Sequence, residues 1–181
     1  MNVKEVLKIA CEFIGLDEIK EAMDYPLSAT EEQTEIINKL LKCFNLVQEE
    51  IATEFLPLTF KQEISATENI YFSLLEKNVL RVLSVKKDKK TLPFKVFPDH
   101  VAFNGSATEI TYNYIPEEVE IDDNILYLVP TRIYAYGIAR EYFVFEGLID
   151  KASMFENRFK NSISALLVKD KNLILPKRTW F

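Results

Sequence analysis

Residues 36–64 read IINKLLKCFNLVQEEIATEFLPLTFKQEI, and the spacing of apolar residues changes within this stretch, at Leu56-Pro57. Before the proline, apolar side chains recur every three or four residues, which is typical of a helix with one buried face. After it, apolar and polar residues alternate from Phe60 to Ile64, as in a half-buried strand. Proline lacks a backbone N–H and disfavours helical angles in the residue before it. The stretch therefore predicts a helix that ends at Leu56, followed by a β region.

Two further features place helices upstream of this point. The segment from Val3 to Ile14 carries apolar residues at spacings of three and four, and Gly15 follows it as an expected end. Thr30 and Gln33 have the spacing of a capping box, in which each side chain bonds the other residue's backbone N–H. We expect one helix over Val3–Ile14 and a second, longer helix that begins after Thr30.

Short alternating segments continue downstream, and residues 60–115 are expected to supply nearly all strands of the protein. They are separated by turn signals: a lysine-rich run at residues 86–90, Pro98-Asp99, and the tight-turn dipeptide Asn104-Gly105. Five or six short strands joined by turns predict a small antiparallel sheet or partial barrel.

Helical spacing returns at about residue 128, with an expected break near Gly147 and a last helix over residues 152–168. The predicted fold class is α+β: a helical bundle of N- and C-terminal helices, an inserted small antiparallel β-sheet or partial barrel, and an extended C-terminal tail. The predicted parts are residues 1–56 and 128–169 for the bundle, 57–127 for the β region with an acidic connection, and 170–181 for the tail.

Composition narrows the class of protein. The chain has 181 residues, of which 48% are hydrophobic and 28% charged, with 4 glycines. These values exclude a disordered chain, collagen and a coiled-coil rod. The first residues carry acids throughout and do not resemble a signal peptide, and no apolar run approaches the length of a membrane span. Cys11 and Cys43 fall at expected core positions of helices, so we expect buried thiols in a soluble, intracellular protein that does not bind membranes.

Charge is unevenly distributed along the chain. The net charge is −6 overall, with −7 over residues 1–56 and +5 over residues 151–181. A net negative charge argues against a protein that binds nucleic acid by neutralising phosphates. The acidic front and the basic end suit head-to-tail contact between copies, and they equally suit pairing within one chain.

Motifs of enzymatic or metal chemistry are few. His100 is the only histidine and follows Pro98-Asp99, where an ordinary turn residue is expected, and the two cysteines are far apart in sequence. The acidic connection, residues 117–124 (EEVEIDDN), lacks the ligand pattern of an EF-hand. We expect a solvated loop in which Asp122, Asp123 or Asn124 caps the following helix. No catalytic residue, metal or cofactor is predicted.

Two groups of residues are candidates for a partner or self-association surface. A lysine-rich turn could contact phosphate, although such a run is usually the solvated tip of a hairpin. The aromatic residues of the segment after residue 128 fall on several faces of one helix, so they are not all expected to reach a single core. Some are expected to face a partner, and the alternative is that they pack on the β part of the same chain. The candidates are Lys86, Lys87, Lys89, Lys90, Tyr134, Tyr142 and Phe145.

The last residues, 173–181 (LILPKRTWF), combine an apolar triplet, two bases and the only tryptophan. Trp and Arg are enriched in binding hot spots. We expect this tail to leave the globular body and dock on another chain, with contact residues Leu173, Leu175, Pro176, Lys177, Arg178, Trp180 and Phe181. The alternative is that it folds back on its own helices.

The sequence resembles the head-to-tail connector (adaptor, or neck) proteins of tailed bacteriophages. The resemblance covers most of the chain from about Ile36. It is carried by QEEIATEFLPL (48–58), LPFKVFPD (92–99), ITYNYIPE (110–117), YGIAREYF (136–143) with Gly147-Leu148, FENRFK (155–160) and LPKRTW (175–180).

The resemblance implies a structural virion protein without enzymatic activity. It would form a ring, typically twelvefold, in the neck between head and tail. The ring binds the portal protein, carries a tail or nozzle protein and surrounds a channel through which DNA passes without sequence-specific contact. It also makes the portal the expected partner of the C-terminal tail, and the host cytoplasm the place of synthesis. An acidic chain suits such a channel, because a lumen that attracts phosphate would slow the DNA.

Two other classes of function remain open on the sequence. One is a small regulatory or chaperone-like binding protein that acts as a monomer or dimer. The other is an enzyme with a carboxylate site in a cleft between bundle and sheet, which a carboxyl group of perturbed pKa in a deep pocket would indicate.

Overall fold

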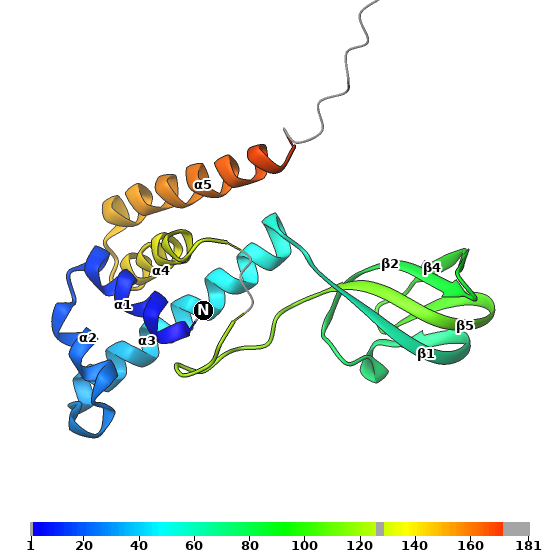
Figure 1. Cartoon of the computed structure of the whole chain (residues 1–181), viewed down its shortest axis with the longest axis horizontal. Coiled ribbons are helices and arrows are strands. Elements are labelled where there is room, and N and C mark those ends of the chain that lie inside the picture. The colour runs from blue at the N-terminus through cyan, green and yellow to red at the C-terminus, as the bar shows by residue number, and fades with distance from the viewer. Residues whose placement is uncertain (1, 126–128, 172–181) are drawn as a thin grey trace, which may run out of the picture. The chain divides into compact units, whose positions relative to one another are not determined.

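The computed structural model describes residues 2–125 and 129–171, the last four by their backbone only. It divides into two compact units, each described here by itself: a helical unit, from the described residues of Met1–Val47 and Val119–Phe181, and a sheet unit, Gln48–Glu118 (Figure 1). The predicted boundaries lay at residues 57 and 128, about nine residues later in the chain. The predicted α+β class, with a small antiparallel sheet of five strands, is confirmed.

The helical unit begins with α1 (Val3–Ile14), α2 (Asp17–Asp24) and the 3-10 turn η1 (Pro26–Ser28). Helix α3 (Glu31–Glu50) runs through the boundary at residue 47 and continues as a π-helical turn, η2 (Ile51–Phe55). Two helices complete the unit, α4 (Thr131–Phe145) and α5 (Ile149–Lys171). Residues 170 and 171, which were predicted to belong to the tail, therefore have helical backbone.

The ends of the first helices follow the sequence signals. Gly15 ends α1 in the left-handed conformation, with φ of 86°, and its N–H bonds the Cys11 carbonyl. The Thr30 hydroxyl accepts from the Gln33 N–H at 3.2 Å, and the Gln33 side-chain oxygen accepts from the Thr30 N–H at 2.9 Å. The predicted capping box is thus confirmed at the start of α3.

Helix α4 lies at the centre of the helical unit. Phe44 of α3 stacks on Tyr134 with ring centroids 5.2 Å apart, and Phe13 of α1 stacks on Tyr136 at 5.1 Å. From α5, Phe155 stacks on Phe143 at 5.7 Å. Because α1, α3 and α5 each cover a part of α4, this helix buries side chains around most of its circumference.

The sheet unit contains β1 (Leu58–Tyr71), β2 (Val79–Lys87), β3 (Lys90–Leu92), β4 (Phe94–Val96) and β5 (His100–Tyr114). All pairings are antiparallel, in the order β1-β5-β2-β3, with β4 also paired to β5. Every strand of the described chain lies between residues 58 and 114, as the sequence predicts.

Strands β2 and β4 both pair with β5, but β3 and β4 do not pair with each other, so the hydrogen-bonded sheet of the described strands stays open. The second half of β5 pairs with β2, and β2 pairs with β3. Only Pro93 separates β3 from β4, which pairs with the first half of β5. Strand β1 follows β5 over almost its whole length, from Leu58 opposite Tyr114 to Tyr71 opposite His100.

Asn104-Gly105 does not form the predicted hairpin turn. Strand β5 continues through it, and Gly105, with φ of 91°, lies at an irregularity in the β1–β5 ladder. Glu68 of β1, also at positive φ (68°), occupies the same irregularity between Thr67 and Asn69. Positive φ at a glycine serves a β-bulge as well as a turn, and a bulge bends the strands that it interrupts.

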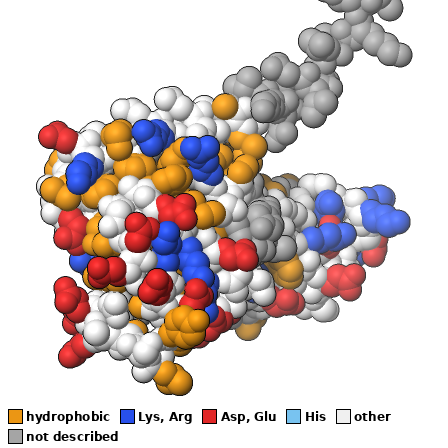
Figure 2. All heavy atoms as spheres, turned by 60° about the vertical axis from the view of Figure 1, so that its left-hand side comes forward, with side chains coloured by type: hydrophobic (Ala, Val, Ile, Leu, Met, Phe, Trp, Pro, Cys, Tyr) orange, Lys and Arg blue, Asp and Glu red, His pale blue; other side chains and the backbone are white. Residues whose placement is uncertain are grey.

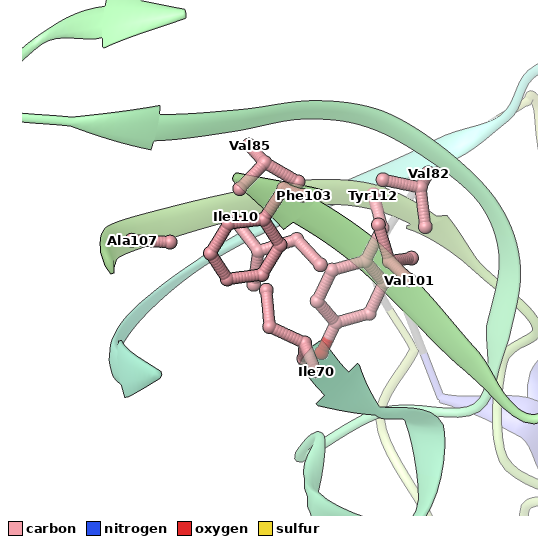
Figure 3. Packing of buried hydrophobic residues seen from close by; sticks show 8 residues of the cluster. All are labelled: Ile70, Val82, Val85, Val101, Phe103, Ala107, Ile110 and Tyr112. Atoms are coloured by element: carbon pink, nitrogen blue, oxygen red, sulfur yellow. The ribbon is translucent and has the colours of Figure 1, made fainter. Parts of the chain in front are cut away.

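The core of the sheet unit consists of side chains from β1, β2 and β5 that meet on one face (Figure 3). At its centre are Ile110 and Tyr112 of β5, both fully buried, with Val85 of β2 and Ile70 of β1 beside them. The Tyr112 hydroxyl donates to the side-chain oxygen of Gln62 at 3.0 Å. This alternation of buried residues along β5 is the period-two pattern of the sequence.

Within the described residues, no helix combines the length and the apolar character that crossing a membrane requires.

Candidate interaction surfaces

Most aromatic residues of α4 are interior, including two of the three that were predicted as candidates for a partner surface. Tyr134 is fully buried, and Tyr136, Tyr142 and Phe143 are nearly so. Burial raises the pKa of Tyr134 to about 12, and its hydroxyl has no hydrogen-bond partner among the described residues. The prediction assumed a helix with a single covered face, whereas α4 is the central helix and is covered on several sides. Tyr134 and Tyr142 are therefore not part of an exposed surface of this unit.

Phe145, the remaining aromatic candidate, is exposed at the corner between α4 and α5. Its exposed fraction is 53%, and Val144, Leu148 and Ile149 around it are about equally accessible. Gly147 makes this turn at φ of 71°, in agreement with the break predicted there. We call these four apolar residues the corner patch. An exposed group of large apolar side chains is typical of a protein-binding surface.

Charged groups border the corner patch. Lys39 of α3 forms an ion pair with Glu146 at 2.6 Å, and this hydrogen bond raises the pKa of the lysine. Lys151 of α5 lies over the ring of Phe143, 5.2 Å from its centroid. An apolar centre with charged residues around it is the usual composition of a protein interface.

The lysine-rich segment forms the predicted hairpin tip. Lys87 pairs with Lys90, and the two residues between them, Asp88 and Lys89, have φ of 48° and 70°, as in a type I′ turn. Lys86 differs, because its ammonium lies 3.2 Å from the Glu109 carboxylate. Lys87, Lys89 and Lys90 are exposed. Figure 2 shows basic side chains gathered at one end of the sheet unit.

Glu109 is held between two lysines on the surface of the sheet. Lys61 of β1 and Lys86 of β2 both contact its carboxylate. The hydrogen bond from Lys61, more than that from Lys86, lowers the pKa of Glu109. Such a group stays ionised, which is the opposite of what a general acid requires.

The acidic connection caps the first helix and not the following one. The Asp123 carbonyl accepts from the Val3 N–H at 3.0 Å, and the Ile121 carbonyl accepts from the Lys4 N–H at 3.1 Å. Asp122 also forms an ion pair with Lys4 at 3.1 Å. At the start of α4, Pro130 occupies the N-cap position and no side chain caps the helix. The prediction that the connection caps the following helix is wrong, because the open N–H groups of α1 lie against the connection although they are far from it in sequence.

His100 is the first residue of β5, paired with Tyr71, and follows the bend at Pro98-Asp99 that the sequence predicts. Its Nδ1 lies 2.7 Å from the Asp99 carboxylate, and its ring stacks on Phe97 at 4.7 Å between centroids. This hydrogen bond lowers the pKa of Asp99.

Besides Glu109 and Asp99, Glu156 is a third carboxyl group with a displaced pKa. It is partly buried, and burial alone would raise its pKa. Hydrogen bonds from Lys160 and Arg140 outweigh that effect, and the pKa of Glu156 is lowered.

Two grooves lie where α1, α2 and the start of α3 meet. The larger, of 590 Å³, runs from Gly15 to Ile36 and includes Asp17, Glu18 and Glu32. The smaller, of 320 Å³, contains Glu18, Glu21 and Tyr25. None of the three carboxyl groups with a lowered pKa lines either groove. In the part of the chain that the structure describes, no three His, Cys, Asp or Glu side chains are grouped as a metal site would require.

Outside the described residues lie the tail candidates, which are Leu173, Leu175, Pro176, Lys177, Arg178, Trp180 and Phe181.

Phe145 is the one member of the corner patch that the sequence predicted as a contact residue. Its other members could have been found from the apolar pairs Val144-Phe145 and Leu148-Ile149 on either side of Gly147, since a turn between two helices is seldom buried.

No protein-family model matches the sequence, and a search of curated proteins finds no significant match.

Proposed function

We propose that the protein is a head-to-tail connector of a tailed bacteriophage, a ring component that binds the portal and carries a tail or nozzle protein. The observation that carries the proposal is where the segments resembling that family lie in the fold. Several of them occupy positions at which helices or strands end or at which helices contact one another. The resemblance therefore includes residues that fix the ends and the packing of these elements, as well as surface residues.

The segment at residues 48–58 contains the π-helical turn that ends α3 and the proline that precedes β1. The segment at residues 136–143 contains Gly137, where α4 approaches Val47 of α3 and Phe159 of α5. Phe155 and Phe159 of the segment at residues 155–160 are both buried. The helices before and after the inserted sheet unit thus pack together, as the sequence pattern predicts.

Charge supports assembly into a ring. On the face in Figure 2, most acidic side chains of the helical unit lie over its middle and lower part, and several basic ones lie near its top. In a ring, each copy presents two different surfaces to its neighbours. Opposite charges on those surfaces favour the correct neighbour and orientation and contribute little net affinity.

The corner patch supports a role in protein binding. Phe145 and Ile149 are more than half exposed, which leaves apolar area that a partner would cover. We assign this patch and the C-terminal tail to contacts with the portal or with a neighbouring copy, and DNA to the channel of the ring.

Co-sedimentation with the portal protein of the same genome tests the proposal. The full chain is expected to sediment with the portal in several copies, and raising the salt concentration is expected to weaken the complex without abolishing it. The variant Phe145→Ser/Ile149→Ser is expected to bind less, whereas the matched control Leu74→Ser, an exposed apolar residue of the sheet unit, is expected to bind normally. Absence of binding by the folded full chain would contradict the proposal.

A further inference from the structure

Strand β1 has an open edge. It pairs with β5 on one side, and no strand of the described chain pairs with the other. The strand is 14 residues long and contains no proline, although edge strands are usually short or interrupted. A β-bulge at Ile64 and Ser65, between the pairs Glu63–Glu109 and Ala66–Ala107, is its main irregularity before Thr67. The regular part of the open edge is therefore Leu58–Ile64.

The core-facing side chains of this segment are incompletely covered. Phe60 and Ile64 pack against the buried core of the sheet unit but remain only partly buried, whereas residues of the central strand β5 on the same face are fully buried. Gln62, between them, is fixed by hydrogen bonds from the Tyr112 hydroxyl and from the Glu76 N–H. An additional strand beside β1 would bury the rest of this apolar row.

The sequence of the open edge is complementary to itself. When the Phe60–Ile64 segments of two copies are placed antiparallel with Gln62 opposite Gln62, each Lys61 faces a Glu63 and each Phe60 faces an Ile64. Opposite charges and apolar pairs are combinations that stabilise neighbouring strands. Moving the centre by one residue, to Lys61, would place the two lysines opposite each other.

The charges on the exposed face favour this pairing. Glu63 lies directly opposite Glu109 in the β1–β5 ladder, and it has no ion-pair partner among the described residues. Lys61 and Lys86 already neutralise Glu109. Within one chain, the Glu63 carboxylate lies next to that of Glu109. Lys61 of a second copy, placed beside Glu63, would therefore compensate its negative charge.

We propose that the free protein forms a twofold-symmetric dimer in which the β1 strands of two copies pair antiparallel about Gln62, joining two five-stranded sheets into one. The occupant of the edge is thus a second copy of this chain. Because the contact has a twofold axis, each favourable pair occurs twice, as in any isologous interface. The inference does not rest on the proposed connector function, because the contact belongs to the sheet unit and exists without a portal.

A charge-swap series in sedimentation equilibrium tests the dimer. The full chain is expected to change from monomer to dimer as its concentration rises. Glu63→Lys places two lysines opposite each other at two symmetric positions and is expected to raise the dissociation constant about 30-fold. The double variant Lys61→Glu/Glu63→Lys restores opposite charges across the contact and is expected to recover most of the affinity. The control Lys87→Glu makes a charge reversal at the hairpin tip and is expected to change little.

Cross-linking supplies a readout that does not depend on a charge effect. Lys61→Cys and Glu63→Cys place thiols on residues that face each other between copies, and the native thiols Cys11 and Cys43 are buried. An equimolar mixture of the two variants is expected to form mixed disulfide dimers faster than either variant alone. The proposal is overturned if the folded full chain stays monomeric at millimolar concentration. It is also overturned if a dimer forms that neither responds to the swap nor cross-links preferentially in the mixture.

Discussion

Replacing Gly137 by alanine tests how closely the three long helices pack. A Cβ atom at this position would lie 2.6 and 2.9 Å from the two Cγ atoms of Val47 and 3.3 Å from a ring carbon of Phe159. Rotation of the Val47 side chain does not relieve the contact, because both methyl groups are too close and the side chain is fully buried. The methyl group can be accommodated only if α4 moves away from α3.

Two opposing effects set the magnitude. Glycine to alanine in a helix interior normally stabilises a protein by about 1 kcal/mol. One extra methyl group in a filled core costs about 1–3 kcal/mol, and the contact at 2.6 Å places this site at the upper end. We expect Gly137→Ala to lower the free energy of unfolding of the helical unit by about 1–2 kcal/mol.

Urea denaturation followed by circular dichroism measures the change. Val47→Ala removes the obstructing methyl groups and is itself expected to cost about 2 kcal/mol. The free energy of unfolding that the double variant loses is expected to be smaller than the sum of the two single losses by at least about 1 kcal/mol. The reason is that the new methyl group fills the space that the Val47 side chain leaves. Asn157→Ala, at an exposed position of α5, controls for helix propensity. A stabilising effect of Gly137→Ala alone would refute the packing described for α3 and α4.

Three further predictions concern a cap, the buried thiols and the tail. Thr30→Ala removes the hydroxyl of the capping box and is expected to cost about 1 kcal/mol in urea denaturation, with Ser28→Ala as a nearby control. Burial raises the pKa of Cys11 and Cys43 from 9.0 to about 12, so the unfolded chain loses these protons at lower pH than the folded one. The melting temperature should therefore fall as pH rises above about 9, and less steeply in Cys11→Ala/Cys43→Ala; equal slopes would contradict the assignment. Deletion of residues 174–181 is expected to leave the melting temperature nearly unchanged while abolishing attachment to the portal, and unfolding of the truncated chain would instead place the tail in its own core.

Local signals predicted the fold wherever a residue acts through its immediate neighbours. Gly15 ends α1 and the Thr30–Gln33 capping box begins α3, because both depend on backbone geometry within a few residues. The change of period at Pro57 separated helix from strand for the same reason. Helix α2 was missed because its N-cap, Leu16, makes no side-chain bond and the helix has only eight residues, so no start signal or long period marks it.

Features set by distant parts of the chain could not be read locally. Gly105 has the same positive φ in a bulge as in a turn, and only its pairing with β1 distinguishes the two. Tyr134 and Tyr142 of α4 were predicted as surface candidates because the number of helices that pack around one helix cannot be inferred from local sequence. The acidic connection was assigned to the next helix, whereas it caps the helix at the other end of the chain. In each case the deciding partner is far away in sequence.

Electron microscopy of the protein assembled on the portal of the same genome tests the proposed function most directly. The connector account predicts a closed ring of many copies, about twelve by the family resemblance, centred on the portal axis around an open channel. A single copy on the portal, a symmetric dimer there, or no density for the protein in the assembled particle would contradict it.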